Sequence, residues 1–194
     1  MLEQQINKKN NIADIEQWAI DGDKKYLEDE YSCPTRDIFQ ARLAGFLEEL
    51  RKKLDDDNRA FLLTAIVGEI GNNSFDHNLG KWLDTPGICF DWEPNNNLII
   101  LADRGQGILA TIKNARPETN NDQEALNTAF TETLSGRASE RRGNGLKFVR
   151  QVTQANNIEI SFYSGNALCF INNNEFTVKL ATKNTPGTLT IVKF

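Results

Sequence analysis

Hydrophobic positions in the first 80 residues recur every three or four positions, the spacing that places side chains on one face of an α-helix. This pattern predicts three helices, over Ile12–Ile20, Asp37–Lys53 and Asn58–His77. Thr35 is a suitable N-cap for the second helix, because its side-chain oxygen can accept a hydrogen bond from a backbone N–H of the first turn. The apolar residues of this helix either cover the end of a sheet, the interpretation we favour, or form the surface of a homodimer.

Beyond residue 80 the pattern changes to short apolar runs separated by turn-forming residues, which is typical of β-strands. The predicted strands are Gly87–Trp92, Leu98–Ala102, Ile158–Tyr163, Ala167–Ile171, Phe176–Ala181 and Pro186–Phe194. Further short helices are predicted over Ile108–Lys113, Glu124–Phe130 and Leu146–Val152. Helices followed by strands indicate an α+β sandwich rather than a doubly wound sheet.

Residues 114–142, which we call the lid segment, form a long and mainly polar excursion between the predicted elements. A connection of this length is unusual inside a compact domain, so we expect it to serve as a functional lid. The segment is polar and lacks apolar anchors, so we expect it not to be ordered without a ligand.

The composition is ordinary for a globular protein: 39% of the 194 residues are hydrophobic and 25% are charged. The net charge of −5 argues against a general nucleic-acid or anionic-membrane surface. No stretch is long and apolar enough to cross a bilayer, so we expect no membrane association. The three cysteines are odd in number and far apart, which suits reduced thiols in a cytoplasmic protein.

Candidate chemistry begins in the third predicted helix. At 100° per residue, one side of this helix carries Leu62, Ile66, Glu69, Asn73 and His77. An apolar stripe that should face a core therefore continues as a carboxylate, an amide and an imidazole. Buried polar groups without partners cost about 1–3 kcal/mol each. We therefore expect partners such as a divalent metal ion with phosphates, unless the helix simply becomes exposed at its C-terminal end.

Two glycine motifs follow. Asp103-Arg-Gly-Gln-Gly107 comes directly after a buried strand, where a carboxylate can accept a hydrogen bond from an exocyclic amine and the glycines allow close backbone approach. Gly143-Asn-Gly145 precedes a helix, where backbone N–H groups can bind phosphate. The basic residues near the second motif are Arg137, Arg141, Arg142, Lys147 and Arg150. They favour a phosphate-bearing ligand, although a solvated basic helix face is the ordinary alternative.

Taken together and in order, these segments resemble the GHKL superfamily of ATPases and kinases, whose members share the Bergerat ATP-binding fold. Glu69, Asn73 and His77 resemble the family's N box. Asp103-Arg-Gly-Gln-Gly resembles the first glycine box, Arg142-Gly-Asn-Gly-Leu the second, and Pro186-Gly-Thr-Leu-Thr the terminal Gly-Thr strand.

The resemblance implies a two-layer sandwich, with a mixed, mainly antiparallel sheet covered by helices and with the lid segment closing over ATP. It divides the chain into a helical N-terminal extension, residues 1–55, and a histidine-kinase-like ATP-binding domain, residues 56–194.

The resemblance also implies a role for each matching residue. Asn73 would ligate a Mg²⁺ ion that bridges the phosphates of ATP. Asp103 would accept a hydrogen bond from the adenine amine, and Thr188 would support this contact through a water. Glu69 would be the general base. The other residues assigned to the nucleotide site are His77, Gly105, Gly107, Ile108, Gly143, Asn144, Gly145 and Leu146.

Three further points come from the residues themselves. Arg137 or Arg141 would stabilise charge on the transferred phosphoryl group, an assignment made from charge alone. Asp76 stands where histidine kinases often have a basic residue. Asn72 is a second amide beside Asn73, and the spacing from Glu69 favours Asn73 for the metal.

The single histidine lies in the N box, so autophosphorylation on a histidine of this chain is excluded. We expect no transducer domain of the gyrase type after the Gly-Thr strand. The remaining module is similar to the anti-sigma-factor serine kinases, which phosphorylate a small STAS-type partner. The leading hypothesis is therefore an ATP- and Mg²⁺-dependent serine/threonine kinase acting on a small STAS-like regulatory protein. The alternatives are an ATP-gated binding module or slow ATPase without phosphotransfer, and a relative that no longer binds nucleotide.

Overall fold

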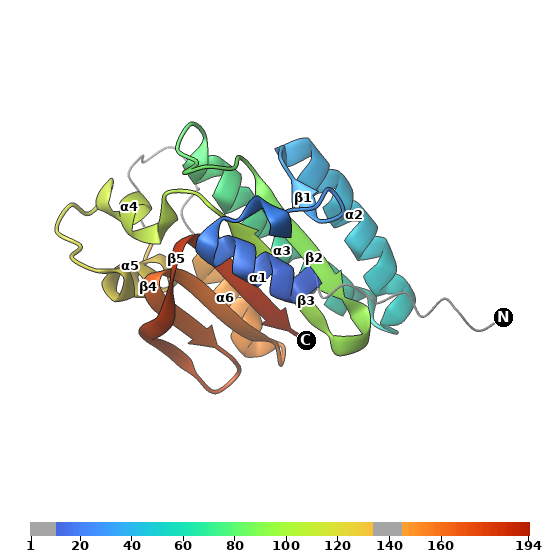
Figure 1. Cartoon of the computed structure of the whole chain (residues 1–194). Coiled ribbons are helices and arrows are strands. Elements are labelled where there is room, and N and C mark those ends of the chain that lie inside the picture. Colours follow the sequence, from blue (N-terminus) through green and yellow to red (C-terminus); the bar gives the residue numbers. More distant parts are fainter. Residues whose placement is uncertain (1–10, 134–144) are drawn as a thin grey trace.

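A computed structural model of the chain describes residues 11–133 and 145–194. Within these ranges the fold is α+β, with six α-helices and a sheet of five strands (Figure 1). The helices are α1 (Asn11–Asp21), α2 (Arg36–Lys53), α3 (Asp57–Asn78), α4 (Gly107–Lys113), α5 (Asp122–Thr131) and α6 (Gly145–Ala155). The strands are β1 (Ser32–Cys33), β2 (Ile88–Glu93), β3 (Leu98–Asp103), β4 (Glu159–Ile171) and β5 (Phe176–Lys193). None of the described helices combines the length and the apolar composition that a membrane span requires.

The sheet has the strand order β1-β2-β3-β5-β4. Every described neighbour pair is antiparallel, so the expected mixed sheet is wrong for this part of the chain. The short connections between β2 and β3 and between β4 and β5 account for half of these pairs, because hairpins join antiparallel strands. The register places Asp103, the last residue of β3, opposite Thr188 of β5.

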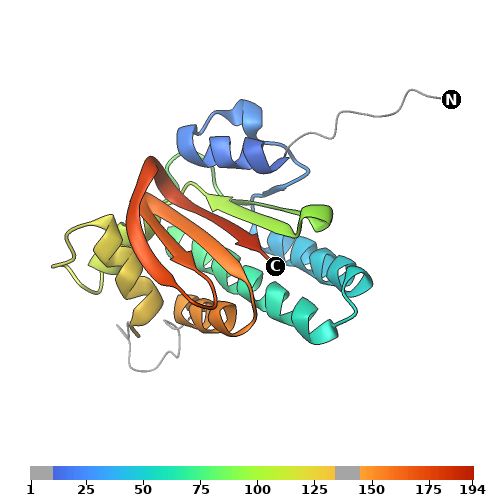
Figure 2. The ribbon, with the colours of Figure 1, turned by 90° about the horizontal axis from the view of Figure 1, so that it is seen from below.

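Helices cover both faces of the sheet. Figure 2 shows α2, α3 and α6 on one face and α1 on the other. The α1 side forms its own apolar cluster, in which Ile15, Trp18 and Ala19 pack against Cys89, Ile100, Ala102 and Leu189 of the sheet. The expected two layers are therefore corrected to a partial third layer, since residues before position 55 supply both α1 and the edge strand β1.

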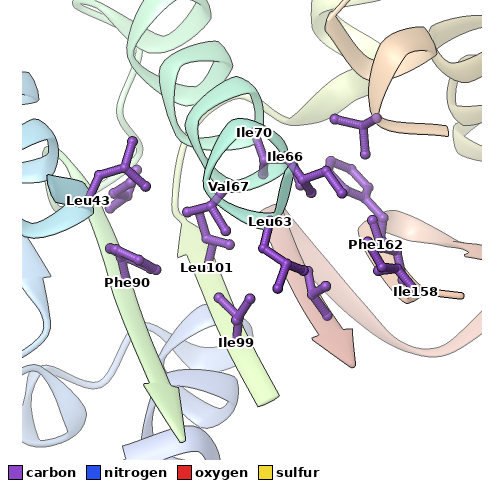
Figure 3. Packing of buried hydrophobic residues seen from close by; sticks show 14 of the residues in the cluster. Leu43, Leu63, Ile66, Val67, Ile70, Phe90, Ile99, Leu101, Ile158 and Phe162 are labelled. Atoms are coloured by element: carbon purple, nitrogen blue, oxygen red, sulfur yellow. The ribbon is translucent and has the colours of Figure 1, made fainter. Parts of the chain in front are cut away.

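The main core lies between the sheet and α3 (Figure 3). Leu63, Ile66, Val67 and Ile70 of α3 are buried against strand residues that include Leu101. Burying one such side chain contributes about 1.5–3 kcal/mol. The α2 residues that complete this core are Phe39, Leu43, Phe46 and Leu50. The second helix therefore covers the sheet, as the favoured interpretation predicted.

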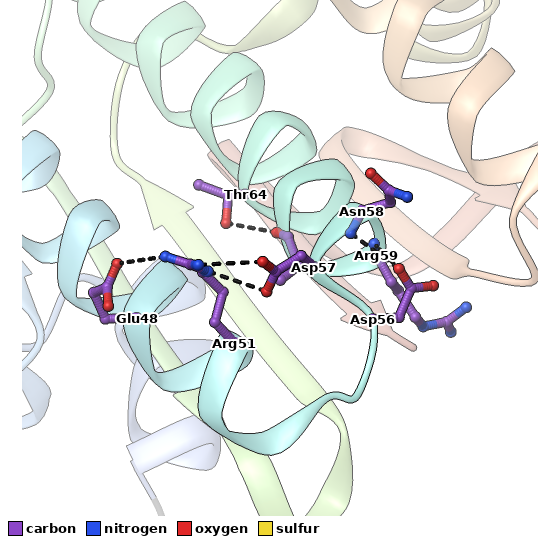
Figure 4. Close-up of polar contacts among 8 residues, drawn as sticks. Glu48, Arg51, Asp56, Asp57, Asn58, Arg59 and Thr64 are labelled. Carbon is purple, nitrogen blue, oxygen red and sulfur yellow. Dashed lines mark hydrogen bonds and ion pairs between the residues drawn. The ribbon is translucent and has the colours of Figure 1, made fainter.

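Side-chain caps set the start of both long helices. Thr35 Oγ1 accepts a 3.4 Å hydrogen bond from the backbone N–H of Ile38, which confirms it as the N-cap of α2. Asp56 Oδ1 accepts 2.9 and 3.2 Å bonds from the N–H groups of Asn58 and Arg59 and caps α3 (Figure 4). Caps of this kind stabilise a helix by about 1 kcal/mol.

The last two strands are longer than the sequence pattern predicts. Four predicted runs merge into one long hairpin, β4 with β5, whose register shifts at Gly165. Gly165 has φ of +58°, and an added Cβ would lie 2.2 Å from the Asp122 carboxylate. Gly165 lies between the predicted strands Ile158–Tyr163 and Ala167–Ile171, and in the structure it is an irregularity inside the single strand β4.

The described part of the lid segment, residues 114–133, is anchored to the core. Leu126 and Phe130 of α5 are fully buried, and the Phe130 ring packs edge-on against Phe162 at 5.3 Å between centroids. The expectation that the segment lacks apolar anchors is therefore wrong for α5. Residues 134–142 lie outside the described residues.

Candidate functional site

Asp103 lies at the centre of the candidate site. Its side chain is at the end of β3 and only 1% exposed. Four donors surround the carboxylate. Oδ1 accepts from Gly105 N at 2.8 Å and from Asn78 Nδ2 at 3.3 Å. Oδ2 accepts from Ser74 Oγ at 2.7 Å and from Thr188 Oγ1 at 2.5 Å. The site thus gathers residues from α3, the loop after β3 and strand β5.

Burial raises the pKa of Asp103 above its ordinary value of 3.8, because the charged form loses its hydration. The hydrogen bonds from Thr188, Ser74 and Gly105 act in the opposite direction and offset part of this rise. The carboxyl group is therefore a strong acceptor in a dry environment, where one hydrogen bond discriminates more between ligands than it would in water.

The glycine loop after Asp103 is held by side chains on both sides. The Gln106 backbone N–H donates to Asn78 Oδ1 at 3.0 Å, and Gln106 Nε2 donates to the His77 carbonyl at 2.8 Å. Gly107 has φ of +75°, and a Cβ at this position would lie 2.9 Å from the Pro186 carbonyl oxygen. Only glycine fits this turn without strain.

The loop then enters α4 next to β4. The Ile108 N–H donates to Ser164 Oγ at 2.9 Å, and Ser164 Oγ donates to the Gly187 carbonyl at 2.8 Å. Ser164 therefore connects the glycine loop to the Gly-Thr segment of β5.

The polar stripe predicted to face the core lies at its rim instead. Ile66 is buried, but Glu69 and His77 are exposed and Asn73 is only half-buried. The buried polar side of α3 is one residue further on, at Ser74 and Asn78. The alternative prediction, that the helix becomes exposed toward its C-terminal end, therefore holds for Glu69 and His77, two of the three polar residues of that stripe.

Glu69 and Asn73 of α3 meet the start of α6. A Cβ built on Gly145 would lie 2.6 Å from Glu69 Oε2 and 3.2 Å from Asn73 Nδ2, so the glycine backbone lies directly against both side chains. Asn72, the competing amide, is directed toward α2, where its Oδ1 accepts from Gln40 Nε2 at 3.0 Å.

Several of these groups line one pocket. The described residues around it are Ile70, Asn73, Ser74, His77, Asn78, Asp103, Gly107, Ile108, Thr111, Leu146, Phe162 and Thr188. Its volume of about 30 Å³ is that of roughly one water molecule. A ligand larger than water therefore enters only if the lining side chains move.

The remaining predicted residues divide into two groups. Arg137, Arg141, Arg142, Gly143 and Asn144 lie outside the described residues, so the structure does not place them. Lys147 and Arg150 are described on α6. The Arg150 guanidinium lies 4.0 Å from the centre of the Phe176 ring, and Lys147 Nζ donates to Thr133 Oγ1 at 3.4 Å. Neither of these two contacts involves the pocket.

Among the described residues, no three His, Cys, Asp or Glu side chains gather as a metal cluster. Asn73 offers an amide oxygen and Glu69 a carboxylate beside it. The amide oxygen of Asn73 suits a Mg²⁺ ion that takes its other ligands from phosphate and water, because Mg²⁺ is commonly held by few protein oxygens.

Sequence reasoning missed Ser74, Asn78 and Ser164. The first two continue the buried stripe of α3, Leu63, Val67 and Ile70, at intervals of three and four. That continuation was a usable signal. Ser164 had no such signal, because its contacts depend on the register of β4 against β5.

Comparison of the chain with known proteins gives no match to a protein-family model and none to a curated protein.

Proposed function

We propose that this chain is an ATP-binding regulatory protein of the GHKL type, which transfers the γ-phosphoryl group of ATP to a serine or threonine of a small STAS-like partner protein. One observation carries the proposal. The buried Asp103 carboxylate forms the floor of a pocket whose lining includes Asn73, and Asn73 lies against Gly145 at the start of α6. Three separate segments that resemble nucleotide-binding boxes are thereby brought together.

The floor of the pocket suits adenine. The adenine amine can donate to Asp103, and the neighbouring ring nitrogen needs a donor. The hydroxyls of Ser74 and Thr188 both donate to Oδ2 of Asp103, and a hydroxyl can rotate. Either hydroxyl can turn toward the ring nitrogen while the amine takes its place at Oδ2.

The start of α6, beside the pocket residue Asn73, suits phosphates. Gly145 has no side chain, so the start of α6 can approach a phosphate beside Asn73, and helix N-termini favour anions. Glu69 is exposed at the same position. As general base it would take the proton of the partner's hydroxyl while that oxygen bonds to the γ-phosphorus and ADP leaves.

Calorimetric titration with ATP and Mg²⁺ tests the binding step. Asp103→Asn and Asn73→Ala should each weaken binding, while the exposed control variants Asp55→Asn and Asn58→Ala should not. Thermal melts of each variant separate lost binding from lost folding. If the wild type shows neither heat of binding nor stabilisation by ATP, the proposal is overturned.

Incubation with γ-labelled ATP and a STAS-like protein encoded nearby tests the transfer step. Label on a serine or threonine of the partner supports the kinase, and Glu69→Gln should abolish it without abolishing ATP binding. A tight ATP-dependent complex without label transfer supports the ATP-gated binding module instead, and the kinase assignment then falls.

A further inference from the structure

We infer that Asn78 is a positioning residue of the nucleotide site, which orients the Asp103 carboxylate and thereby sets the preference for adenine. This inference rests on the proposed function, since it concerns how the same pocket selects its base. Asn78 lies outside the segments that resemble the GHKL boxes, at the last position of α3.

Both ends of the Asn78 amide are bonded within the site. The side chain is 4% exposed. Its Nδ2 donates to Asp103 Oδ1 at 3.3 Å, and its Oδ1 accepts from the Gln106 N–H at 3.0 Å. One side chain therefore holds the carboxylate and the glycine loop at the same time.

The packing leaves this amide no freedom. A Cβ on Gly105 would lie 2.0–2.2 Å from the amide atoms of Asn78, so the loop backbone lies directly on the amide plane. The backbone carbonyl of Asn78 also accepts a 2.8 Å hydrogen bond from the Lys81 N–H, which holds the backbone of Asn78 in place.

The two oxygens of Asp103 differ because of Asn78. Oδ1 is held by two nitrogen donors, Asn78 Nδ2 and Gly105 N, which cannot turn into acceptors. Oδ2 is held by two hydroxyls, which can rotate and exchange. Oδ1 is thus the fixed end of the carboxylate and Oδ2 the end available to a ligand.

No other side chain of this size supplies the same pair of bonds. Aspartate keeps the acceptor for Gln106 but loses the donor and places a second carboxylate beside Asp103. Serine is too short to bridge both groups. In either variant Oδ1 keeps only the Gly105 N–H as a donor, so the carboxylate is held less firmly in the orientation that presents Oδ2 to an amine donor rather than to the carbonyl of guanine.

The test compares MgATP with MgGTP, which share their phosphates and differ only in the base. Asn78→Asp and Asn78→Ser should lower the ratio of ATP to GTP affinity by about tenfold or more. Asn58→Asp is the matched control, because it adds the same charge to an exposed position of the same helix. Its ratio should equal that of the wild type.

Two results would overturn the inference. One is an unchanged ratio in both Asn78 variants. The other is an equal loss of ATP and GTP affinity, because a side chain that merely supports the fold would weaken both alike. Melting curves identify any variant that fails to fold, and Asn78→Ser avoids the added charge of Asn78→Asp. A wild type that binds neither nucleotide overturns the proposed function itself, whereas a wild type that binds ATP normally leaves only the role of Asn78 at risk.

Discussion

The Thr188 hydroxyl donates a 2.5 Å hydrogen bond to the Asp103 carboxylate, although the two residues are 85 positions apart in the chain. They are direct partners across β3 and β5, so the antiparallel register of these strands creates the contact. The resemblance implies that Thr188 supports the contact of Asp103 with adenine through a water, and the structure adds a direct bond from the Thr188 hydroxyl to Asp103. The site is therefore built from the sheet as much as from α3.

Replacing the hydroxyl of Thr188 should destabilise the protein. Thr188→Val keeps the shape but removes a donor to a buried carboxylate, and we expect a loss of about 1–3 kcal/mol in the free energy of unfolding. Thr188→Ser keeps the hydroxyl and should retain most of the stability. Urea denaturation monitored by circular dichroism measures both changes.

Thr190 provides the matched control on the same strand. It is fully buried, and among the described residues its Oγ1 has no hydrogen-bond partner. Thr190→Val should therefore be neutral or stabilising, because it removes a buried polar atom that gains nothing from the fold. Equal losses at both positions would show that the bond to Asp103 contributes nothing.

Stability should depend on pH through Asp103. Its folded-state pKa is raised by burial above 3.8, so the folded state holds the proton more tightly than the unfolded state. This contribution is complete below pH 3.8 and is lost as the pH rises through the folded-state pKa. The stability of the wild type relative to Asp103→Asn should therefore fall as the pH rises from 3.8 to the folded-state pKa of Asp103, and should level off above that pKa.

Asp84 should show the opposite sign. The hydrogen bond from Arg104 lowers the pKa of Asp84 below 3.8, so its contribution is present above that pH and lost as the pH falls through the folded-state pKa. Urea titrations of Asp103→Asn and Asp84→Asn across the acidic range compare the two directly. Parallel pH profiles would contradict the assignment of either shift.

Arg104 should hold α1 against the sheet. The guanidinium is nearly buried and forms a 2.8 Å ion pair with Asp84, while Nη1 donates to the carbonyls of Trp18 and Ala19 at 3.3 and 2.9 Å. Arg104→Ala leaves these acceptors without their donor, and we expect a loss of about 1–3 kcal/mol. Hydrogen exchange should accelerate first in α1.

Two variants sharpen the Arg104 test. Arg104→Lys should not restore the wild-type stability, because an ammonium lacks the planar fork that reaches carboxylate and carbonyls together. Arg51→Ala removes an exposed ion pair with Asp57 and should have little effect. If Arg104→Ala behaves like Arg51→Ala, the buried contacts of Arg104 do not hold α1.

Phe130 should anchor α5. Its ring is fully buried against Phe162 and Phe176. Phe130→Ala should cost about 3–5 kcal/mol, or release α5 if that helix opens on its own. Hydrogen exchange of α5 compared with α3 separates the two outcomes. Phe130→Leu should retain most of the anchoring. Unchanged protection of α5 from hydrogen exchange in Phe130→Ala would contradict the anchoring role of Phe130.

Helix positions followed closely from the sequence because their signals are local. Thr35 and Asp56 have the chemistry of N-caps, and the apolar spacing of α2 and α3 is regular. The predicted buried face of α3 was wrong by one residue at its C-terminal end. Adjacent stripes through Asn73 and Ser74 differ by one residue, and only packing against the sheet decides between them.

Contacts that depend on tertiary structure could not be predicted in this way. Gly165 lies between two predicted strands, and nothing near it in the sequence shows that β4 continues to pair with β5 beyond it. The anchoring of α5 depends on Phe162, which is distant in the sequence from Phe130. Asp103 was predicted as a site residue from its motif, but its four donors come from three parts of the chain.

The position of α1 and β1 has a practical consequence for shortened versions of the chain. An expression clone starting at residue 56 would uncover the sheet face formed by Cys89, Ile100, Ala102 and Leu189. It would also turn β2 into an unprotected edge strand and deprive Arg104 of two acceptors. Exposed apolar faces and open strand edges promote aggregation. A fragment cut at the boundary suggested by the sequence should therefore precipitate, although it keeps the residues around Asp103 that line the pocket.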